Sequence, residues 1–159
     1  MAAIDFPTSP TAGQSYSIGG KTWTWETAST SWISNTIVGS SVIEIPFTID
    51  GGGSAITTGV KGYLSIPYTC TINQVIVLAD VSGSIVVDIW KDTYANYPPV
   101  DADSITAAAV PTITTATKSQ DATLTGWTTT ITAGDILGFN VDSITTCQRV
   151  TISLKVTKT

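Results

Sequence analysis

Residues 149–157 read Arg-Val-Thr-Ile-Ser-Leu-Lys-Val-Thr, and this stretch decides the fold. Its apolar side chains fall at every second position, and polar side chains occupy the positions between them. Successive side chains of a β-strand point to opposite faces, so a period of two predicts a strand with one buried and one exposed face. We therefore expect residues 149–157 to form a half-buried strand.

Further strand signals come before this segment and are separated by Gly- and Asp-containing turns. Pro46 and Pro67 interrupt two of the runs, which suits edge positions because proline cannot donate to a ladder. No convincing amphipathic helix occurs, so an α/β fold is disfavoured. The pattern predicts an all-β protein, an antiparallel β-sandwich or jelly-roll-like domain. The expected strands are 42–49, 63–68, 71–79, 84–91, 124–131, 135–142 and 149–157, with turns at 50–54, 80–83 and 133–135.

Composition supports the same class. Of the 159 residues, 42% are hydrophobic and only 12% are charged, about half the usual ~25% share. Threonine supplies much of the remaining polarity, and its β-branched side chain suits the solvent face of a strand. Because charge is depleted at interface cores, this sparsely charged chain is expected to form an oligomer.

The first 35 residues are expected to form a separate unit. Two short strands, 16–18 and 21–25, flank Gly19-Gly20, a pattern that predicts a β-hairpin. Trp23 and Trp25 are two residues apart and project to one face, over which Trp32 can close. So small a unit needs a docking partner for stability.

The expected boundaries are a module at 1–35, a joint at 36–41 and a β-sandwich domain at 42–159. The aromatic side chains of the module either fill its own small core or anchor it to a partner protein, because tryptophan is favoured at interface cores. The candidate attachment residues are Phe6, Tyr16, Trp23, Trp25 and Trp32.

Residues 92–120 are expected to form a long irregular loop with a short helical turn near 103–105, capped by Asp103. A loop of this length in a compact domain is usually functional or part of an interface. The adjacent Trp90 and Trp127 are expected to pack in the core. The candidate receptor or interface contacts are Tyr94, Tyr97, Asp101 and Asp103.

Charge excludes several partners. The net charge is −5, and the seven basic residues are scattered along the chain. Without a basic stripe, binding to nucleic acid or to an anionic membrane surface is disfavoured. No apolar run reaches the ~18–20 residues of a membrane span. Residues 1–15 lack the pattern of a signal peptide, so we expect synthesis in the cytoplasm.

The residues needed for common catalysis are missing. The chain contains no histidine, which excludes histidine-dependent triads and histidine-ligated metals. Carboxylate pairs such as Asp88 with Asp92 are interpreted as turn, cap and solvating groups. Asp101-x-Asp103 lacks the further oxygen ligands of a strong calcium motif. We therefore expect neither an enzyme nor a cofactor or metal.

Two cysteines, Cys70 and Cys147, each lie within or beside a predicted strand. Two thiols so far apart in sequence cannot form a tetrahedral zinc site by themselves. They are either buried free thiols or the two halves of a single disulfide, and the sequence leaves both alternatives open.

Several motifs resemble bacteriophage proteins. D-F-P-x-S-P at 5–10, G-K-T-W-T-W at 20–25 and the later Trp32 resemble a short module at the front of many phage tail-fibre and other virion proteins, as does G-Q-x-Y at 13–16. Segments 49–62, 82–92 and 124–135 are similar to a β-rich domain of phage structural proteins. The resemblance implies a fibre-like homotrimer attached through its N-terminal module to other virion proteins. It carries over no catalytic residues.

The resemblance and the composition together favour a virion structural protein. We expect a short fibre or knob whose β-domain faces outward and contacts a host-surface glycan or receptor. A capsid decoration or head-fibre protein is the first alternative, and a free carbohydrate-binding module is the second. A depolymerase is disfavoured by the absence of histidine and the scarcity of glutamate.

Overall fold

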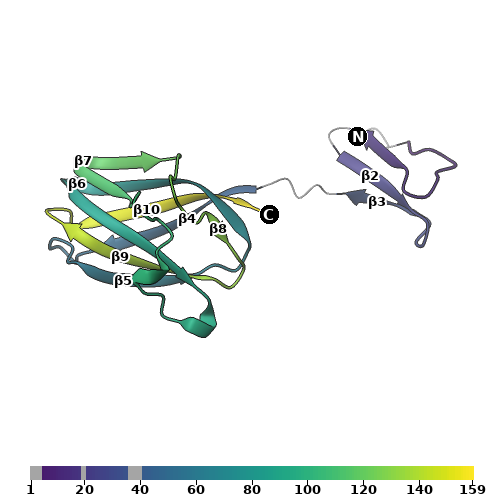
Figure 1. Ribbon diagram of the computed structural model, residues 1–159. Coiled ribbons are helices and arrows are strands. Elements are labelled where there is room, and N and C mark those ends of the chain that lie inside the picture. The colour runs from purple at the N-terminus through teal and green to yellow at the C-terminus, as the bar shows by residue number, and fades with distance from the viewer. Residues whose placement is uncertain (1–4, 19–20, 36–40) are drawn as a thin grey trace. The chain divides into compact units, whose positions relative to one another are not determined.

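The computed structural model describes residues 5–18, 21–35 and 41–159, and it divides into two compact units, residues 1–39 and 40–159 (Figure 1). Each unit is described by itself. The expected Gly19-Gly20 turn, and the expected joint apart from Ser41, lie outside the described residues.

The N-terminal unit is a three-stranded antiparallel sheet in the order β1-β2-β3. A third strand adds to the expected hairpin and carries Trp32. In the observed register Trp25 lies directly opposite Trp32, and Tyr16 lies opposite Trp23. The bounds are β1 Ser15–Ile18, β2 Lys21–Glu26 and β3 Ser31–Asn35.

The C-terminal unit is one curled antiparallel sheet of seven strands in the order β4-β10-β6-β9-β5, with β7 and β8 paired to β6. The expectation of an all-β, antiparallel, sandwich-like domain is confirmed. Two short 3-10 helices are present in this unit. The bounds are β4 Ser41–Asp50, β5 Gly59–Ser65, β6 Cys70–Asp92, η1 Tyr94–Asn96, η2 Asp101–Asp103, β7 Thr112–Asp121, β8 Thr130–Ile131, β9 Ile136–Ile144 and β10 Arg149–Lys158.

Strand β10 confirms the alternation from which the fold was predicted. Val150, Ile152, Leu154 and Val156 are all fully buried. Of the polar positions, Arg149 and Lys155 are exposed, while Ser153 is buried and donates to Glu44. The strand pairs with β4 on one side and with β6 on the other. Burial on one face and pairing along both edges place β10 at the centre of its layer.

Strand β6 passes through both layers of the sandwich (Figure 1). Its first part, up to Ala79, pairs with β10, and its second part, from Ile85, pairs with β9. The prediction of a turn at 80–83 is therefore wrong, because these residues continue strand β6. Hydrogen bonds from the 145–148 segment hold these residues in an extended path. The bonds run from Gln148 N to Asp80 Oδ1 (3.1 Å), from Thr146 Oγ1 to Ser82 O (2.8 Å) and from Thr145 N to Ser84 O (2.9 Å).

Gly83 allows this close approach. A Cβ atom at position 83 would lie 2.8 Å from the Sγ of Cys147, inside normal contact distance. Cys147 is fully buried, so its sulfur cannot move into solvent. The crossing point of β6 thus depends on a glycine at this position.

The two end strands of the curled sheet, β4 and β5, approach each other over the core. The ring of Phe47 on β4 stacks on Phe139 of β9, with centroids 4.0 Å apart and planes at 3°. A Cβ at Gly62 on β5 would lie 3.0 Å from the Phe47 ring. The stack closes the sandwich at its open side, where no backbone pairing joins β4 to β5.

One loop prediction and one strand prediction are corrected. Residues 112–120, expected as loop, lie in the edge strand β7, in which Ile113 alone is fully buried. Threonine favours strands, but small polar residues give no clear alternation. Residues 124–131, expected as strand, pair only at Thr130–Ile131, because Leu124 and Gly126 have positive φ angles of 49° and 79° that break an extended path.

Candidate binding surface

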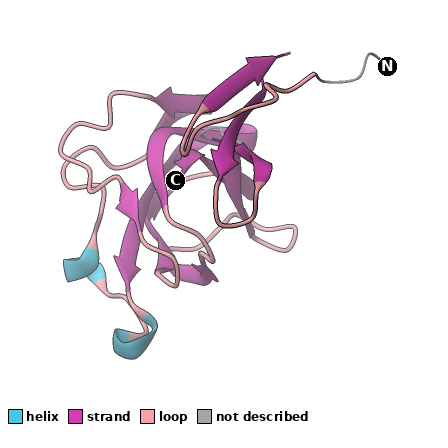
Figure 2. Cartoon of the chain, turned by 90° about the vertical axis from the view of Figure 1, so that its right-hand side faces the viewer, coloured by secondary structure: helices cyan, strands magenta, loops and turns pink. Residues whose placement is uncertain are grey.

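The outer face of the β5-β9-β6 layer carries the loop of residues 93–111. On β6, Val87 and Ile89 point into the core, so Asp88 and Trp90 point outward. The loop covers both residues, and Ser104 forms an isolated bridge to Trp90. Figure 2 shows the two 3-10 turns of this loop, in cyan, standing out from the strands. The expected short helical turn is present slightly earlier than predicted, at Asp101–Asp103.

Asp88 holds the loop from beneath. Only 6% of this residue is exposed, and its carboxylate accepts hydrogen bonds from Ser104 Oγ (2.8 Å) and Thr106 Oγ1 (2.6 Å) of the loop. It also accepts from Trp90 Nε1 (2.9 Å) and from the backbone N–H of Ile89 (2.7 Å). A buried carboxylate with this many donors is well satisfied, and removing it would leave several buried donors unpaired.

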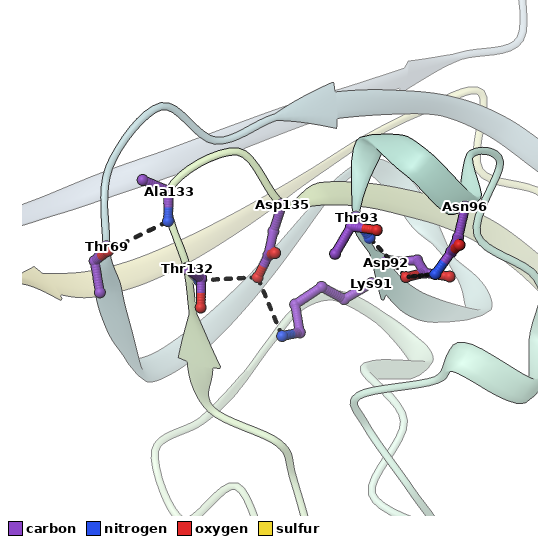
Figure 3. A network of polar contacts seen from close by, with 8 residues as sticks. All are labelled: Thr69, Lys91, Asp92, Thr93, Asn96, Thr132, Ala133 and Asp135. Atoms are coloured by element: carbon purple, nitrogen blue, oxygen red, sulfur yellow. Dashed lines mark hydrogen bonds and ion pairs between the residues drawn. The ribbon is translucent and has the colours of Figure 1, made fainter.

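A second carboxylate fixes the start of the loop, as Figure 3 shows. Asp92 Oδ1 accepts from the backbone N–H of Thr93 (2.6 Å) and from Asn96 Nδ2 (3.1 Å), and it thereby closes the turn that carries Tyr94. Short local bonds of this kind favour a single turn conformation.

The preceding residue is tied to the sheet by an ion pair in the same view (Figure 3). Lys91 Nζ lies 3.1 Å from Asp135 Oδ2, which also accepts from the backbone N–H of Thr132 at 2.8 Å. Asp135 is buried and Lys91 is half-buried, so water screens this pair less than an exposed one. The end of β6 is therefore anchored where the loop begins.

The tyrosines of the loop lie at the surface. Tyr94 is 82% exposed and Tyr97 is 50% exposed. The ring of Tyr97 meets Tyr63 of β5 edge to face, with centroids 5.0 Å apart. Aromatic pairs prefer this geometry, so Tyr63 supports the ring of Tyr97 and leaves part of it open to a partner.

Gly138 of β9 permits this arrangement. It lies opposite Tyr63 in the register, and a Cβ at this position would lie 3.2 Å from Pro99 Cγ and 3.3 Å from the Tyr63 ring. Pro99 is buried there, directly after Tyr97 and Pro98 in the loop. The bare backbone of Gly138 thus lets the loop lie flat on the sheet.

The two aspartates predicted as contacts have different roles. Asp103 was expected as the N-cap of a turn at 103–105, but it is the last residue of the turn 101–103, and its Oδ2 accepts from the backbone N–H of the N-cap Val100 at 2.8 Å. Asp101 is exposed at the surface of the same turn. Within residues 5–18, 21–35 and 41–159, no three Asp, Glu, Cys or His side chains lie close enough together to hold a metal ion.

Asp142 adds negative charge to this face. Burial raises the pKa of its carboxyl, the nearby Asp88 and Asp101 raise it further, and the hydrogen bond from Asn140 Nδ2 (2.6 Å) opposes the shift. The carboxylates of the loop and of β9 therefore influence one another, although they come from separate segments.

Both tryptophans beside the loop pack as expected. Trp90 is 7% exposed and Trp127 is 9% exposed. Each also satisfies its indole N–H, Trp90 through Asp88 and Trp127 through the carbonyl of Ala109 at 2.9 Å. Neither ring is available to a partner at this surface.

The two cysteines are buried free thiols. Burial raises the pKa of the Cys70 thiol, and the charge of Asp135 raises it further. Burial likewise raises the pKa of Cys147, with a smaller contribution from Asp80. Both thiols therefore stay protonated and pack as small apolar groups.

The aromatic residues predicted for attachment gather around Phe6 in the N-terminal unit. Phe6 stacks on Trp32 at 5.2 Å and meets Trp23 and Tyr16 edge to face at 5.4 and 5.5 Å. Trp25 joins through Trp32 at 5.7 Å. The rings thus form a core for this unit, yet each remains only half-buried.

Several residues of the candidate surface were not identified from the sequence, among them Tyr63, Asp88, Asn140 and Asp142. Tyr63 and Asn140 lie in strands whose apolar pattern gave no reason to single them out. Asp88 was considered only as a paired carboxylate, although a charged residue inside the run Ile-Val-Val-Asp-Ile-Trp at 85–90 signals a buried polar anchor.

Comparisons with known proteins add no family. No protein-family model matches the chain, and no curated protein or solved structure matches it. In the part of the chain that the structure describes, no helix has the length and apolarity to cross a membrane. The functional argument therefore starts from the surface itself.

Proposed function

We propose that this chain is a structural and binding component of a bacteriophage particle, a short fibre or knob whose C-terminal unit faces outward and contacts a host-surface glycan. The observation that carries the proposal is the exposure of Tyr94 and Tyr97 on a loop that a buried carboxylate, Asp88, fixes to the sheet. The resemblance of residues 5–32 to the front module of virion proteins supports the location.

A fixed loop favours binding. Large exposed aromatic rings contribute much contact area to interfaces, and tyrosine loses little conformational entropy when it is covered. Because Asp88 accepts from the hydroxyls of Ser104 and Thr106, and Asp92 accepts from the backbone N–H of Thr93, little further ordering of the loop is needed when a partner arrives. The proposed role is binding, with no catalytic step.

The N-terminal unit is proposed to attach the chain to another virion protein. Its rings pack on one another, but the outer parts of Trp25 and Trp32 remain accessible. A partner that covers these half-buried rings would gain apolar contact and stabilise the small sheet. We also propose a homotrimer, supported by the low share of charged residues and by the resemblance.

Gold-tagged antibody against residues 42–159, applied to intact particles, tests the proposed location. Gold at the tail tip or baseplate is the expected result. Gold spread over the capsid would favour a decoration or head-fibre protein. Absence of gold from particles, with the protein free in the lysate, would overturn the virion role and favour a free carbohydrate-binding module.

Two further measurements test attachment and assembly. Light scattering of the purified chain is expected to give three times the chain mass, and a monomeric mass would exclude the trimer. A chain lacking residues 1–35 is expected to fold and to be absent from particles. Its incorporation at the level of the full chain would exclude attachment through the N-terminal unit.

A further inference from the structure

A continuous surface extends from β5 to the loop of residues 93–111. In the register of β5 and β9, Val60 lies opposite Asn140 and Tyr63 lies opposite Gly138. Val60 is 42% exposed and Tyr63 is 36% exposed, and Tyr97 of the loop packs against Tyr63. Strand β5 and the loop thus present apolar groups side by side, next to Asn140 and Gly138 of β9.

Polar groups border these apolar side chains. The amide of Asn140 is half-buried and donates to Asp142, which is exposed on the same strand. Asp142 is also close enough to Asp101 for the two charges to repel, which brings the exposed end of the 3-10 turn Asp101–Asp103 to the same area. A sugar ring can pack on these apolar groups while its hydroxyls hydrogen-bond to the fixed polar groups beside them.

The charge of the surface restricts its ligand. Asp101 and Asp142 are both exposed, and the buried Asp88 adds a third negative charge beneath them. A sugar hydroxyl can donate a charge-assisted hydrogen bond to such a carboxylate. A sugar that carries its own carboxylate, sulfate or phosphate would instead meet like charge, which is an effective means of rejecting a partner.

We infer that the surface formed by Val60, Tyr63, Tyr97, Asn140 and Asp142 binds a glycan without negative charge and rejects acidic glycans. The ring of Tyr97 packs against a face of the sugar, and the carboxylate of Asp142 accepts its hydroxyl protons in hydrogen bonds. This inference rests on the proposed contact with a host glycan and names the class of sugar and the residues that select it.

Calorimetry with defined oligosaccharides tests the inference on the full chain. The probes are hexamers of glucose and of N-acetylglucosamine, and hexamers of galacturonic acid and of sialic acid. We expect measurable binding of at least one uncharged hexamer, and at least about tenfold weaker binding of both acidic hexamers, the size of effect that one repelled charge produces.

Variants locate the site. Tyr97→Ala is expected to weaken binding of the uncharged hexamer about tenfold, as truncation of a central interface aromatic does, while Tyr97→Phe retains most of it. Leu78→Ala is the matched control, because Leu78 is also half-exposed (49%) but lies on the part of β6 that pairs with β10. The double change Asp101→Asn and Asp142→Asn is expected to reduce the difference in affinity between the uncharged and the acidic hexamers.

The outcomes separate this inference from the proposed function. Tighter binding of an acidic hexamer than of the uncharged hexamers would overturn the inference, while the proposed contact with a host glycan would stand. Equal loss of binding in the Leu78→Ala and Tyr97→Ala variants would place the site elsewhere and also overturn it. Binding of none of the four probes, with gold labelling at the tail tip, would overturn the inference while the virion location stands.

Discussion

The two units of this chain build their cores in different ways. In the C-terminal unit, a curled sheet closes on itself and leaves side chains such as Phe139, Ile152 and Leu154 fully buried. In the N-terminal unit, a three-stranded sheet has one aromatic face, and none of the described side chains in 5–18 and 21–34 is fully buried. The larger unit relies on enclosure, and the smaller one relies on contacts between rings.

The difference teaches how a short segment compensates for its size. Free energy from apolar burial scales with the area removed from water, about 25 cal/mol per Å². A sheet of three short strands removes little area, so each residue must contribute more. Phe6 contacts three other rings at 5.2–5.5 Å, and such pairs add about 0.5–1.5 kcal/mol each beyond burial.

The largest expected effect comes from breaking the enclosure. Phe139→Ala removes a fully buried ring that stacks on Phe47, and we expect it to lower the free energy of unfolding of the C-terminal unit by about 3–5 kcal/mol. Hydrogen exchange resolved by segment in increasing urea would measure the loss in 136–144. Leu78→Ala, at an exposed site, is the control and should stay within about 0.5 kcal/mol of the parent. A loss below about 1 kcal/mol for Phe139→Ala would contradict the enclosed core.

A smaller effect is expected where the C-terminal unit depends on polar burial. Asp88→Ala leaves the hydroxyls of Ser104 and Thr106 and the indole of Trp90 without their acceptor. We expect the free energy of unfolding to fall by about 1–3 kcal/mol relative to the parent. Hydrogen exchange should speed up more in residues 93–111 than in residues 136–144.

Asp88→Asn is the matched variant for this test. It keeps the oxygen that accepts from the loop hydroxyls, but its amide nitrogen faces the Trp90 N–H donor if the side chain keeps its orientation. Its effect should therefore be smaller than that of Asp88→Ala. Unchanged exchange of the loop in both variants would show that other contacts fix it.

In the N-terminal unit, Phe6→Ala removes the ring shared by three contacts. We expect a loss of about 1–2 kcal/mol, smaller than for Phe139 because Phe6 is only half-buried. The near-ultraviolet circular dichroism of the tryptophans and hydrogen exchange in 21–35 would report it. Ile33→Ala is the control, because Ile33 is 45% exposed and points away from the neighbouring Trp32. Equal losses for the two variants would refute a core organised by Phe6.

These contrasts also show what the sequence could predict. The strand at 149–157 was predictable because apolar and polar residues alternate without interruption, and the aromatic face of the N-terminal unit followed from the spacing of Trp23 and Trp25. Strand β7 could not be predicted, since its pairing with β6 depends on a partner distant in sequence and only Ile113 is fully buried.

The candidate surface was predictable only in part. Tyr94 and Tyr97 were identified because a long loop with aromatic residues attracts attention. Tyr63 and Asn140 could not be, because their place beside the loop results from the register of β5 with β9 and from the bare backbone of Gly138. The turn predicted at 80–83 is absent for a similar reason. Hydrogen bonds from the distant segment 145–148 hold these residues extended, against their local turn preference.

The smallest expected effects concern charge, and they have opposite signs at two carboxylates of the C-terminal unit. Burial raises the pKa of Asp142, so the unfolded chain releases this proton first as the pH rises above the usual value of 3.8. Between pH 3.8 and the raised pKa, the folded chain therefore loses stability relative to the unfolded chain, and this loss persists at neutral pH. Asp142→Asn keeps an oxygen to accept from Asn140, and it should melt slightly above the parent at pH 7 and level with it below pH 3.8.

Asp80 should behave in the reverse way. The backbone N–H of Arg149, followed by that of Gln148 at 3.1 Å, lowers the pKa of the Asp80 carboxyl. Its charged form therefore stabilises the fold above the usual value of 3.8. This contribution is lost as the pH falls through the lowered pKa. Asp80→Asn should therefore melt below the parent at pH 7, and the gap should close in acid. Melting temperatures of both variants over a pH series would show it, and shifts of the same sign would mean that local packing outweighs charge at one of the two sites.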